Sequence, residues 1–167
     1  MPVLNVFRMF GLMIGDGEAT RVKANSSKAA DLNEMIRSGV RDDPDVAALA
    51  ATTPAGQTSV MVWHYHDDDL KGPDAAVTLK LSNLPDGDAT IVEYRIDATH
   101  SNTYAAWQAM GSPATPTDEQ YAQLDAAGAL ATTGDPQTTI IENGTVTLAF
   151  ELPRQGVSLF VIRGASE

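Results

Sequence analysis

The eight residues TVTLAFEL at positions 145–152 alternate polar and apolar side chains with a period of two. In an extended chain all the even-numbered, apolar residues point to one side and the odd-numbered residues point to the other. This pattern predicts a β-strand with one buried face. The pair Asn143-Gly144 directly before it favours a tight turn, so 138–142 is the expected partner strand in a hairpin.

Similar runs of β-branched, aromatic and alternating residues occur along the rest of the chain. At least six strands, separated by turn residues such as those at 85–88, predict a mainly β protein built as an antiparallel β-sandwich with a few short helices. The further strands are expected at 20–24, 59–66, 77–81, 92–96 and 157–163.

Four segments carry a helical pattern. Residues 3–14 are apolar on most sides and are followed by glycines, which predicts a helix that packs against something large. A second helix is expected after a cap at Ser26 or Ser27, with Gly39 as its end. A weak helical signal covers 46–50. At 117–127 the sequence Thr-Asp-Glu-Gln forms a capping box at the start of a helix.

The composition limits the classes of function. The chain has 167 residues and a net charge of -11, which favours one globular domain and argues against nucleic acid or anionic membranes as partners. It contains no cysteine, so thiol chemistry and cysteine-based zinc sites are excluded. We expect no cofactor. No segment has the length of a membrane span or the pattern of a signal peptide, and a soluble protein is expected.

The densest group of potential metal ligands is His64, His66, Asp67, Asp68 and Asp69. Alternation puts both histidines on one side of a strand, where they could hold a metal ion together with an aspartate. Two other interpretations stay open. The group could be a strand end followed by a solvated acidic turn, or it could face another domain.

The stretch 100–113 is polar and aromatic and has no clean period. It offers aromatic platforms beside amide and hydroxyl groups, as sugar-binding sites do. The alternative is a loop fastened to the sandwich by buried aromatic side chains. The candidate residues at the rim of a sugar site are His100, Asn102, Tyr104, Trp107 and Gln108.

Several motifs resemble the C-terminal part of bacterial family-39 glycoside hydrolases, which are β-xylosidases related to α-L-iduronidase. The resemblance covers nearly the whole chain. It rests on PVLNVFRMFGLM at 2–13, VWHYHDDD at 62–69, YRID at 94–97, HSN at 100–102, MGSP at 110–113 and LPRQGVS at 152–158.

The resemblance implies a domain division. In that family a (β/α)₈ barrel carries an acid/base glutamate and a nucleophile glutamate, and the chain continues into a β-sandwich beside the barrel. Residues 1–17 then correspond to the final barrel helix and a linker, and 18–167 to the sandwich with the helical insertion near 117–127. The segments that hold both catalytic glutamates are absent, so no residue here inherits either role.

The residues themselves offer no substitute pair of carboxylates. Retaining hydrolysis needs two of them about 5 Å apart. Glu93 and Asp97 share one face of an expected strand, but at about 3.3 Å per residue they lie about 13 Å apart.

Three functions remain open for this sequence. The first is an accessory module that supports the barrel and borders its xyloside cleft. The second is a small stand-alone glycosidase whose site is formed by this chain or its oligomer, and the third is a carbohydrate-binding module. A xylose-containing saccharide is the ligand class considered, and a homo-oligomer formed through the 3–14 helix is expected.

Overall fold

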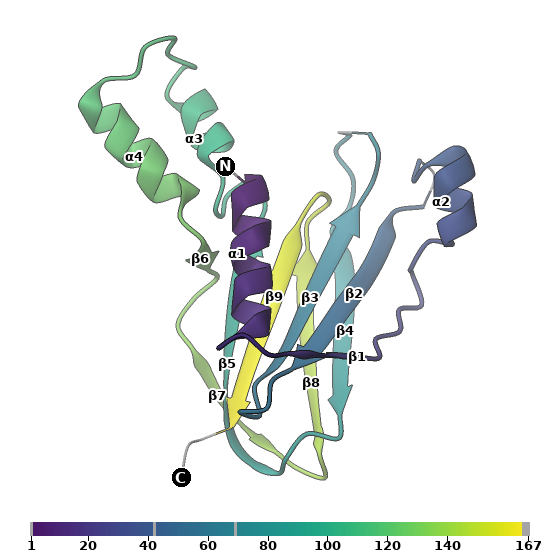
Figure 1. The fold of residues 1–167 in the computed structure, drawn as a ribbon. Helices are drawn as coiled ribbons and strands as arrows, with labels where there is room; N and C mark the ends of the chain where they lie inside the picture. Colours follow the sequence, from purple (N-terminus) through teal and green to yellow (C-terminus); the bar gives the residue numbers. More distant parts are fainter. Residues whose placement is uncertain (1, 42, 69, 165–167) are drawn as a thin grey trace.

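The computed structural model describes residues 2–41, 43–68 and 70–164, which fold into two facing β-sheets with four helices around them (Figure 1). The predicted helix at the start and all seven predicted strands are present, with ends that differ by up to a few residues. The helices are α1 (Pro2–Ile14), α2 (Leu32–Ser38), α3 (Thr103–Ala109) and α4 (Asp118–Gly128); the strands are β1 (Thr20–Val22), β2 (Asp45–Thr52), β3 (Thr58–Tyr65), β4 (Ala75–Ser82), β5 (Gly87–Ile96), β6 (Ala131–Thr132), β7 (Gln137–Ile141), β8 (Thr145–Leu152) and β9 (Val157–Gly164).

The larger sheet has the order β1-β2-β3-β9-β5-β6, and β7 also pairs with β5. The smaller sheet consists of β4 and β8. Every strand pair in the described residues is antiparallel. The prediction of a mainly β, antiparallel sandwich is therefore confirmed. None of the described helices is long and apolar enough to cross a membrane.

The main hydrophobic core lies between the two sheets. Leu152 of β8 is fully buried, and the rings of Phe150 and Phe160 meet across the core with their centroids 4.7 Å apart. Complete burial of one such side chain contributes about 1.5–3 kcal/mol. The prediction that the strand at 145–152 buries one face is thus confirmed, because the apolar residues of β8 face the larger sheet.

The predicted hairpin between 138–142 and 145–152 is wrong, although both strands exist. β7 pairs with β5 and β8 pairs with β4, and only the bridge between Glu142 and Thr145 joins the two segments. Asn143 and Gly144 do form a turn with positive φ angles of 52° and 64°. Beyond that turn the chain crosses from one sheet to the other, so the strands diverge (Figure 1). The turn at 85–88 makes the same crossing between β4 and β5.

The weak helical signal at 46–50 is also wrong, since these residues belong to β2. Alanines favour a helix locally. However, β2 pairs with β3 through eight residue pairs and with β1 on its other edge. The hydrogen bonds of these two neighbours outweigh a local preference of a few tenths of a kcal/mol per residue.

The second helix begins later than predicted. Asp31 caps α2, because its carboxylate accepts from the backbone N–H groups of Asn33 and Glu34. Ser26 instead donates to the carbonyl of Val46. Gly39 ends the helix as expected, with a φ of 74° and so little room that a Cβ atom would lie 2.0 Å from a carboxylate oxygen of Asp67.

The helical insertion forms an arm that projects from the sandwich (Figure 1). We define the arm as residues 103–128. Its second helix, α4, confirms the prediction at 117–127, and Thr117 makes the capping box with Gln120. The first helix, α3, lies inside the stretch 100–113, for which no helix was predicted.

Candidate functional site

One face of α1 lies on its own sheet. Met9 and Met13 are buried against Met61, Leu159 and Val161 on the side of the larger sheet that faces away from the sandwich core. This contact forms a second hydrophobic cluster. The helix therefore folds back over the sandwich and does not extend into solvent.

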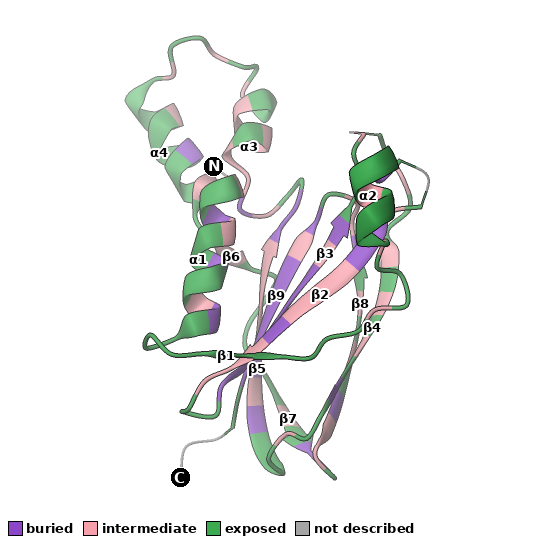
Figure 2. Cartoon of the chain, turned by 45° about the vertical axis from the view of Figure 1, so that its right-hand side comes forward, coloured by how far each residue is buried: buried purple, intermediate pink, exposed green. Residues whose placement is uncertain are grey.

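The opposite face of α1 is apolar and exposed. Phe7 is 66% exposed, and Phe10 is 38% exposed. Figure 2 shows the side of α1 that points away from the sheet as mostly exposed. We call this surface the outer face of α1, and it consists of Val3, Leu4, Phe7, Phe10 and Ile14. Helices of single-domain proteins usually keep such residues in contact with another element.

A buried amide connects α1 to the base of the arm. The side chain of Asn5 is fully buried, and its Nδ2 donates to the carbonyls of Ser101 at 3.1 Å and Gly128 at 3.0 Å. Its Oδ1 accepts from Arg8 at 2.8 Å. Because Ser101 precedes the arm and Gly128 ends it, this one side chain positions both ends of the arm against α1. The sequence analysis did not identify Asn5 as a candidate residue. The signal that could have found it is a polar residue within an otherwise apolar helix.

Two of the predicted rim residues belong to a turn below the arm. His100 Nδ1 lies 2.9 Å from Oδ1 of Asp97. Asn102 caps α3 by accepting from the N–H of Ala105 at 3.2 Å, and its Nδ2 donates to the carbonyl of Asp97. Both side chains therefore shape the start of the arm, and the His100 side chain keeps about a third of its surface exposed.

The turn also controls the charge of Asp97. Burial opposes ionisation of this carboxyl, but hydrogen bonds from the N–H of Thr99, from the side chain and N–H of His100 and from the Thr99 hydroxyl outweigh it. Together they lower the pKa of Asp97 below its ordinary value. Asp97 thus stays ionised at neutral pH and suits a structural role better than that of a general acid.

The other three rim candidates come together on α3. The rings of Tyr104 and Trp107 stack with centroids 5.7 Å apart, and Gln108 donates to the Tyr104 hydroxyl at 3.2 Å. Tyr104 is 59% exposed, so the alternative in which it is buried as a fastening residue is wrong. Trp107 is half-buried, and its indole N–H donates to the carbonyl of Pro113. A stacked aromatic pair with one exposed ring and an adjacent amide is suited to contact with a sugar ring.

The histidine cluster lies at the end of β3. His64 and His66 are both buried, as alternation predicts, and Nδ1 of His64 donates to the carbonyl of Leu152 at 2.9 Å. Nε2 of His66 donates to the carbonyl of Arg41, and its Nδ1 accepts from the N–H of Asp68. Both ring nitrogens of His66 are thus occupied by backbone groups.

Asp67 is exposed next to these histidines. The hydroxyl of Tyr65 and the N–H of Val40 donate to it, and with nearby Arg41 they lower the pKa of its carboxyl. Asp69, the last residue of the predicted cluster, lies outside the described residues. Within residues 2–41, 43–68 and 70–164 no three histidine or carboxylate side chains are grouped to hold a metal ion.

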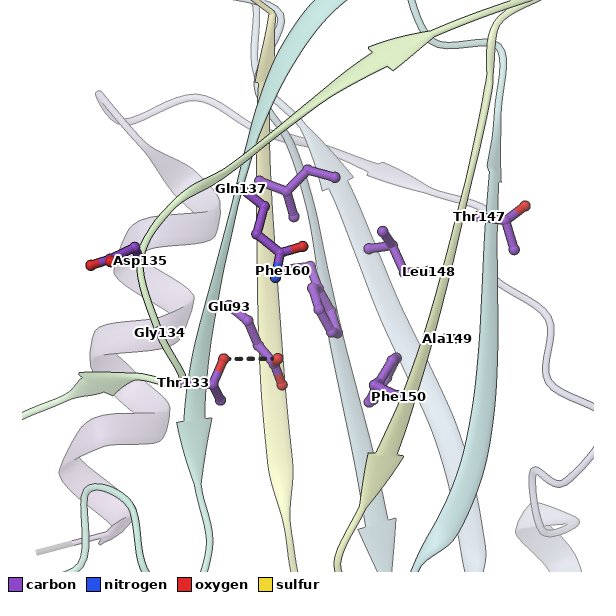
Figure 3. Close-up of a pocket in the computed structure, with 11 residues that line it drawn as sticks. Glu93, Thr133, Gly134, Asp135, Gln137, Thr147, Leu148, Ala149, Phe150 and Phe160 are labelled. Atoms are coloured by element: carbon purple, nitrogen blue, oxygen red, sulfur yellow. Dashed lines mark hydrogen bonds between the residues drawn. The ribbon is translucent and has the colours of Figure 1, made fainter.

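A polar group that the sequence did not reveal lies inside the sandwich. Glu93 forms an ion pair with Arg95 at 2.5 Å, and it accepts from Ser158 at 2.7 Å and from Thr133 at 3.0 Å. Of these residues, Glu93 and Thr133 line a cavity of about 370 Å³ between the sheets, next to Phe150 (Figure 3). Asp135 also lines this cavity, but in Figure 3 its carboxylate is directed away from that of Glu93. Its carboxylate therefore does not form an acid pair with Glu93.

Comparisons with known proteins place this arrangement in context. The sequence model of glycosyl hydrolases family 39 matches residues 1–140. Mouse α-L-iduronidase is 30% identical over 132 residues, which cover 74% of this chain and 19% of that protein. The chain thus spans about a fifth of the length of this relative.

Two solved structures share the fold. The bacterial orthologue of human α-L-iduronidase superposes with a TM-score of 0.65 at 23% identity, over 72% of this chain and 22% of that one. A monomeric β-xylosidase from Caulobacter crescentus superposes with a TM-score of 0.60 at 18% identity, over 76% and 29% of the two chains. In both cases the similarity covers less than a third of the larger protein.

Proposed function

The chain belongs to glycosyl hydrolase family 39, and from this membership we propose that it forms the accessory β-sandwich module of a β-xylosidase-like glycoside hydrolase. In this proposal residues 1–17 are the last helix of a catalytic barrel with its linker, and residues 18–167 are the sandwich. The module supports the barrel and borders its xyloside cleft.

The outer face of α1 carries the proposal. One side of this helix already covers the larger sheet through Met9 and Met13, while Phe7 and Leu4 on the other side are exposed. A helix that is apolar on two sides is suited to lie between two bodies. The sandwich is the first body, and we propose the barrel as the second.

The carboxylates of the module support a non-catalytic role. Glu93 is neutralised by Arg95, and Asp97 is held ionised by the turn around it. A glycosidase needs one carboxyl with a raised pKa as the acid and a second carboxylate beside it. Asp97 lacks the raised pKa of the acid, and Glu93 has the cation of Arg95 beside it, so we assign hydrolysis to the barrel.

An activity assay tests the proposal directly. The purified chain should release no p-nitrophenol from p-nitrophenyl β-D-xyloside above the rate in buffer, while an intact β-xylosidase serves as positive control. Release that survives purification and falls in Glu93→Gln or Asp97→Asn would support the rival stand-alone glycosidase and overturn the accessory role.

The stacked pair of the exposed Tyr104 and the half-buried Trp107 favours a second candidate function, carbohydrate binding by the arm. In this proposal the ring of a xylose-containing saccharide lies on Tyr104, and Gln108 and His100 offer polar contacts. Titration with xylo-oligosaccharides should give saturable heat. Trp107→Ala should reduce this heat, since the stacking of a sugar on aromatic rings depends on the area of those rings. Absence of binding in the unaltered chain would refute this second function.

A further inference from the structure

Within the described residues, the arm is attached to the rest of the molecule at its base. Its two helices, α3 and α4, pack on each other, and no other described helix or strand packs against either of them to a similar extent. Leu124 is the one buried residue among 103–128. Figures 1 and 2 show the two helices projecting beyond the end of the sandwich. Little buried apolar surface therefore opposes a change in the orientation of the arm.

The arm is connected internally. The indole N–H of Trp107 in α3 donates to the carbonyl of Pro113, in the loop between the helices, at 3.1 Å. The hydroxyl of Thr103 donates to the carbonyl of Leu124 in α4 at 3.4 Å. Both bonds lie within the arm, so a rotation of the whole arm breaks neither of them. The arm can therefore move as one body.

The base below the arm is fixed to the sandwich. Ser101 is 3% exposed, and its hydroxyl donates to the carbonyl of Arg95 in β5 and accepts from the N–H of Ala131 in β6. One side chain thus joins the segment that enters the arm to the strand that follows it. Because the arm begins after Ser101 and ends at Gly128, its two connections to this base lie close together and form a hinge.

Two side-chain hydrogen bonds of the described residues join the arm to its surroundings across this hinge. Nδ2 of Asn5 donates to the carbonyl of Gly128 at 3.0 Å, and Nδ2 of Asn102, the cap of α3, donates to the carbonyl of Asp97 at 3.0 Å. Asn5 also donates to Ser101, so it contacts both sides of the hinge. A rotation that carries Gly128 away from α1 breaks the first of these bonds.

We propose that the arm is a hinged lid, which turns as one body about 101–102 and 128–129, and that Asn5 is the latch that holds it in the orientation of Figure 1. The stacked rings of Tyr104 and Trp107 belong to the lid and move with it. At about 1.5 Å per residue the 11 residues of α4 span about 16 Å, so a rotation of about 20° moves the far end by about 6 Å. Lids that open and close substrate clefts move in this way.

The functional consequence of the lid rests on the accessory role proposed above. In that role the arm borders the xyloside cleft of the barrel, and a rotation of the lid opens and closes this cleft. The rotation itself is a property of this chain, so it is measured without the barrel and without a saccharide. Failure of the lid is thus distinguished from failure of the accessory role, which the xyloside assay tests.

Pulsed electron paramagnetic resonance measures the orientation of the arm. The chain contains no cysteine, so spin labels attach selectively to Ala122→Cys on α4 and Thr78→Cys on β4, both at exposed positions. With Asn5 present we expect one main distance and at most about a tenth of the molecules at other distances. Asn5→Ala should enlarge this second population about five-fold, because the observed orientation loses the hydrogen bond to Gly128. Labels at Thr78→Cys and Thr138→Cys, on β4 and β7, should give one narrow distribution in every variant.

Two further variants separate a latch from a general loss of stability. Asn5→Asp keeps the volume of the side chain but replaces the donating Nδ2 by an oxygen, and it should enlarge the second population as Asn5→Ala does. Met9→Ala removes a buried side chain of the same helix that packs on the larger sheet, and it should leave the distances unchanged. Circular dichroism verifies that each variant is folded. Unchanged distances in the folded Asn5 variants overturn the proposal, and so does an equal change in Met9→Ala.

Discussion

The side-chain amide of Asn5 donates to the backbone carbonyl of Ser101, which lies 96 positions later in the chain, at a distance of 3.1 Å. Through this bond and its partner to Gly128, a polar side chain on an apolar helix determines where the arm joins the sandwich. The orientation of the aromatic pair on the arm therefore depends on α1.

We expect Asn5→Ala to lower the free energy of unfolding by about 1–3 kcal/mol, because the buried carbonyl of Ser101 and the partly buried carbonyl of Gly128 lose their donor. Urea unfolding followed by circular dichroism measures the change. Asn33→Ala, on the exposed α2, should change stability by less than about 0.5 kcal/mol. Equal effects of the two substitutions would show that the buried amide has no special role.

The two faces of α1 should respond differently to truncation of a side chain. Met9→Ala removes a fully buried side chain and should cost about 2–5 kcal/mol. Phe7→Ala removes an exposed ring and should leave the stability of the isolated monomer nearly unchanged. The same urea experiment compares them at low protein concentration. A larger loss for Phe7→Ala would mean that the helix is oriented differently.

The outer face of α1 should make the isolated chain self-associate when no barrel covers it. Light scattering should detect a dimer whose dissociation constant rises at least ten-fold when Phe7→Glu and Phe10→Glu are introduced together. These variants are better than a chain starting at Glu18, because that deletion would also uncover Met61 and Leu159. A monomer for the unaltered chain at all concentrations contradicts this prediction.

The stability of the protein should fall in acid partly because of Asp97. Its pKa is lowered in the folded state, so its ionised form stabilises the fold at pH values above the ordinary carboxyl pKa of about 3.9. This contribution is lost as the pH falls from about that value through the lower folded pKa. We expect Asp97→Asn to be less stable than the unaltered chain at pH 6 and to lose less stability between pH 5 and pH 2. Parallel pH profiles of the two proteins would contradict the assignment.

Treatment with a chelator should not change the melting temperature. His66 uses both ring nitrogens for backbone contacts, so we expect the cluster at the end of β3 to stabilise the fold without metal. A decrease of several degrees that added zinc reverses would instead establish a metal site, because a ligand of the native state stabilises it by mass action. Differential scanning calorimetry before and after dialysis against EDTA measures the effect.

Local signals in the sequence were enough to predict the class of the fold and many positions within it. The alternation at 145–152 identified both the strand and the face that it buries, because side chains of a strand alternate between its two sides. The capping box at Thr117 and the glycine at position 39 located one end of each of two helices. These signals are local, since each depends only on residues within one turn or strand.

The candidate residues were also identified from local composition, but their surroundings were not. Tyr104, Trp107 and Gln108 come together because α3 forms a helix, which brings residues three and four positions apart onto one side. The stretch 100–113 gave no clear period for that helix. Glu93 acquires its three partners from β5, β9 and the loop before β7, and their spacing in the sequence carries no sign of this.

The pairing of the strands and the surface that α1 covers became visible only in the folded chain. A period of two indicates which side chains face a core, but it is equally satisfied in either sheet, so it could not show that β7 joins β5 while β8 joins β4. The alanine-rich segment of β2 became a strand because β1 and β3 supply hydrogen bonds from distant parts of the chain. Likewise α1 is apolar on both sides, and the methionines of one side are buried because the larger sheet offers Met61 and Leu159 at that place. These choices depend on contacts between residues far apart in sequence, whose free energies exceed the local preferences that a sequence displays.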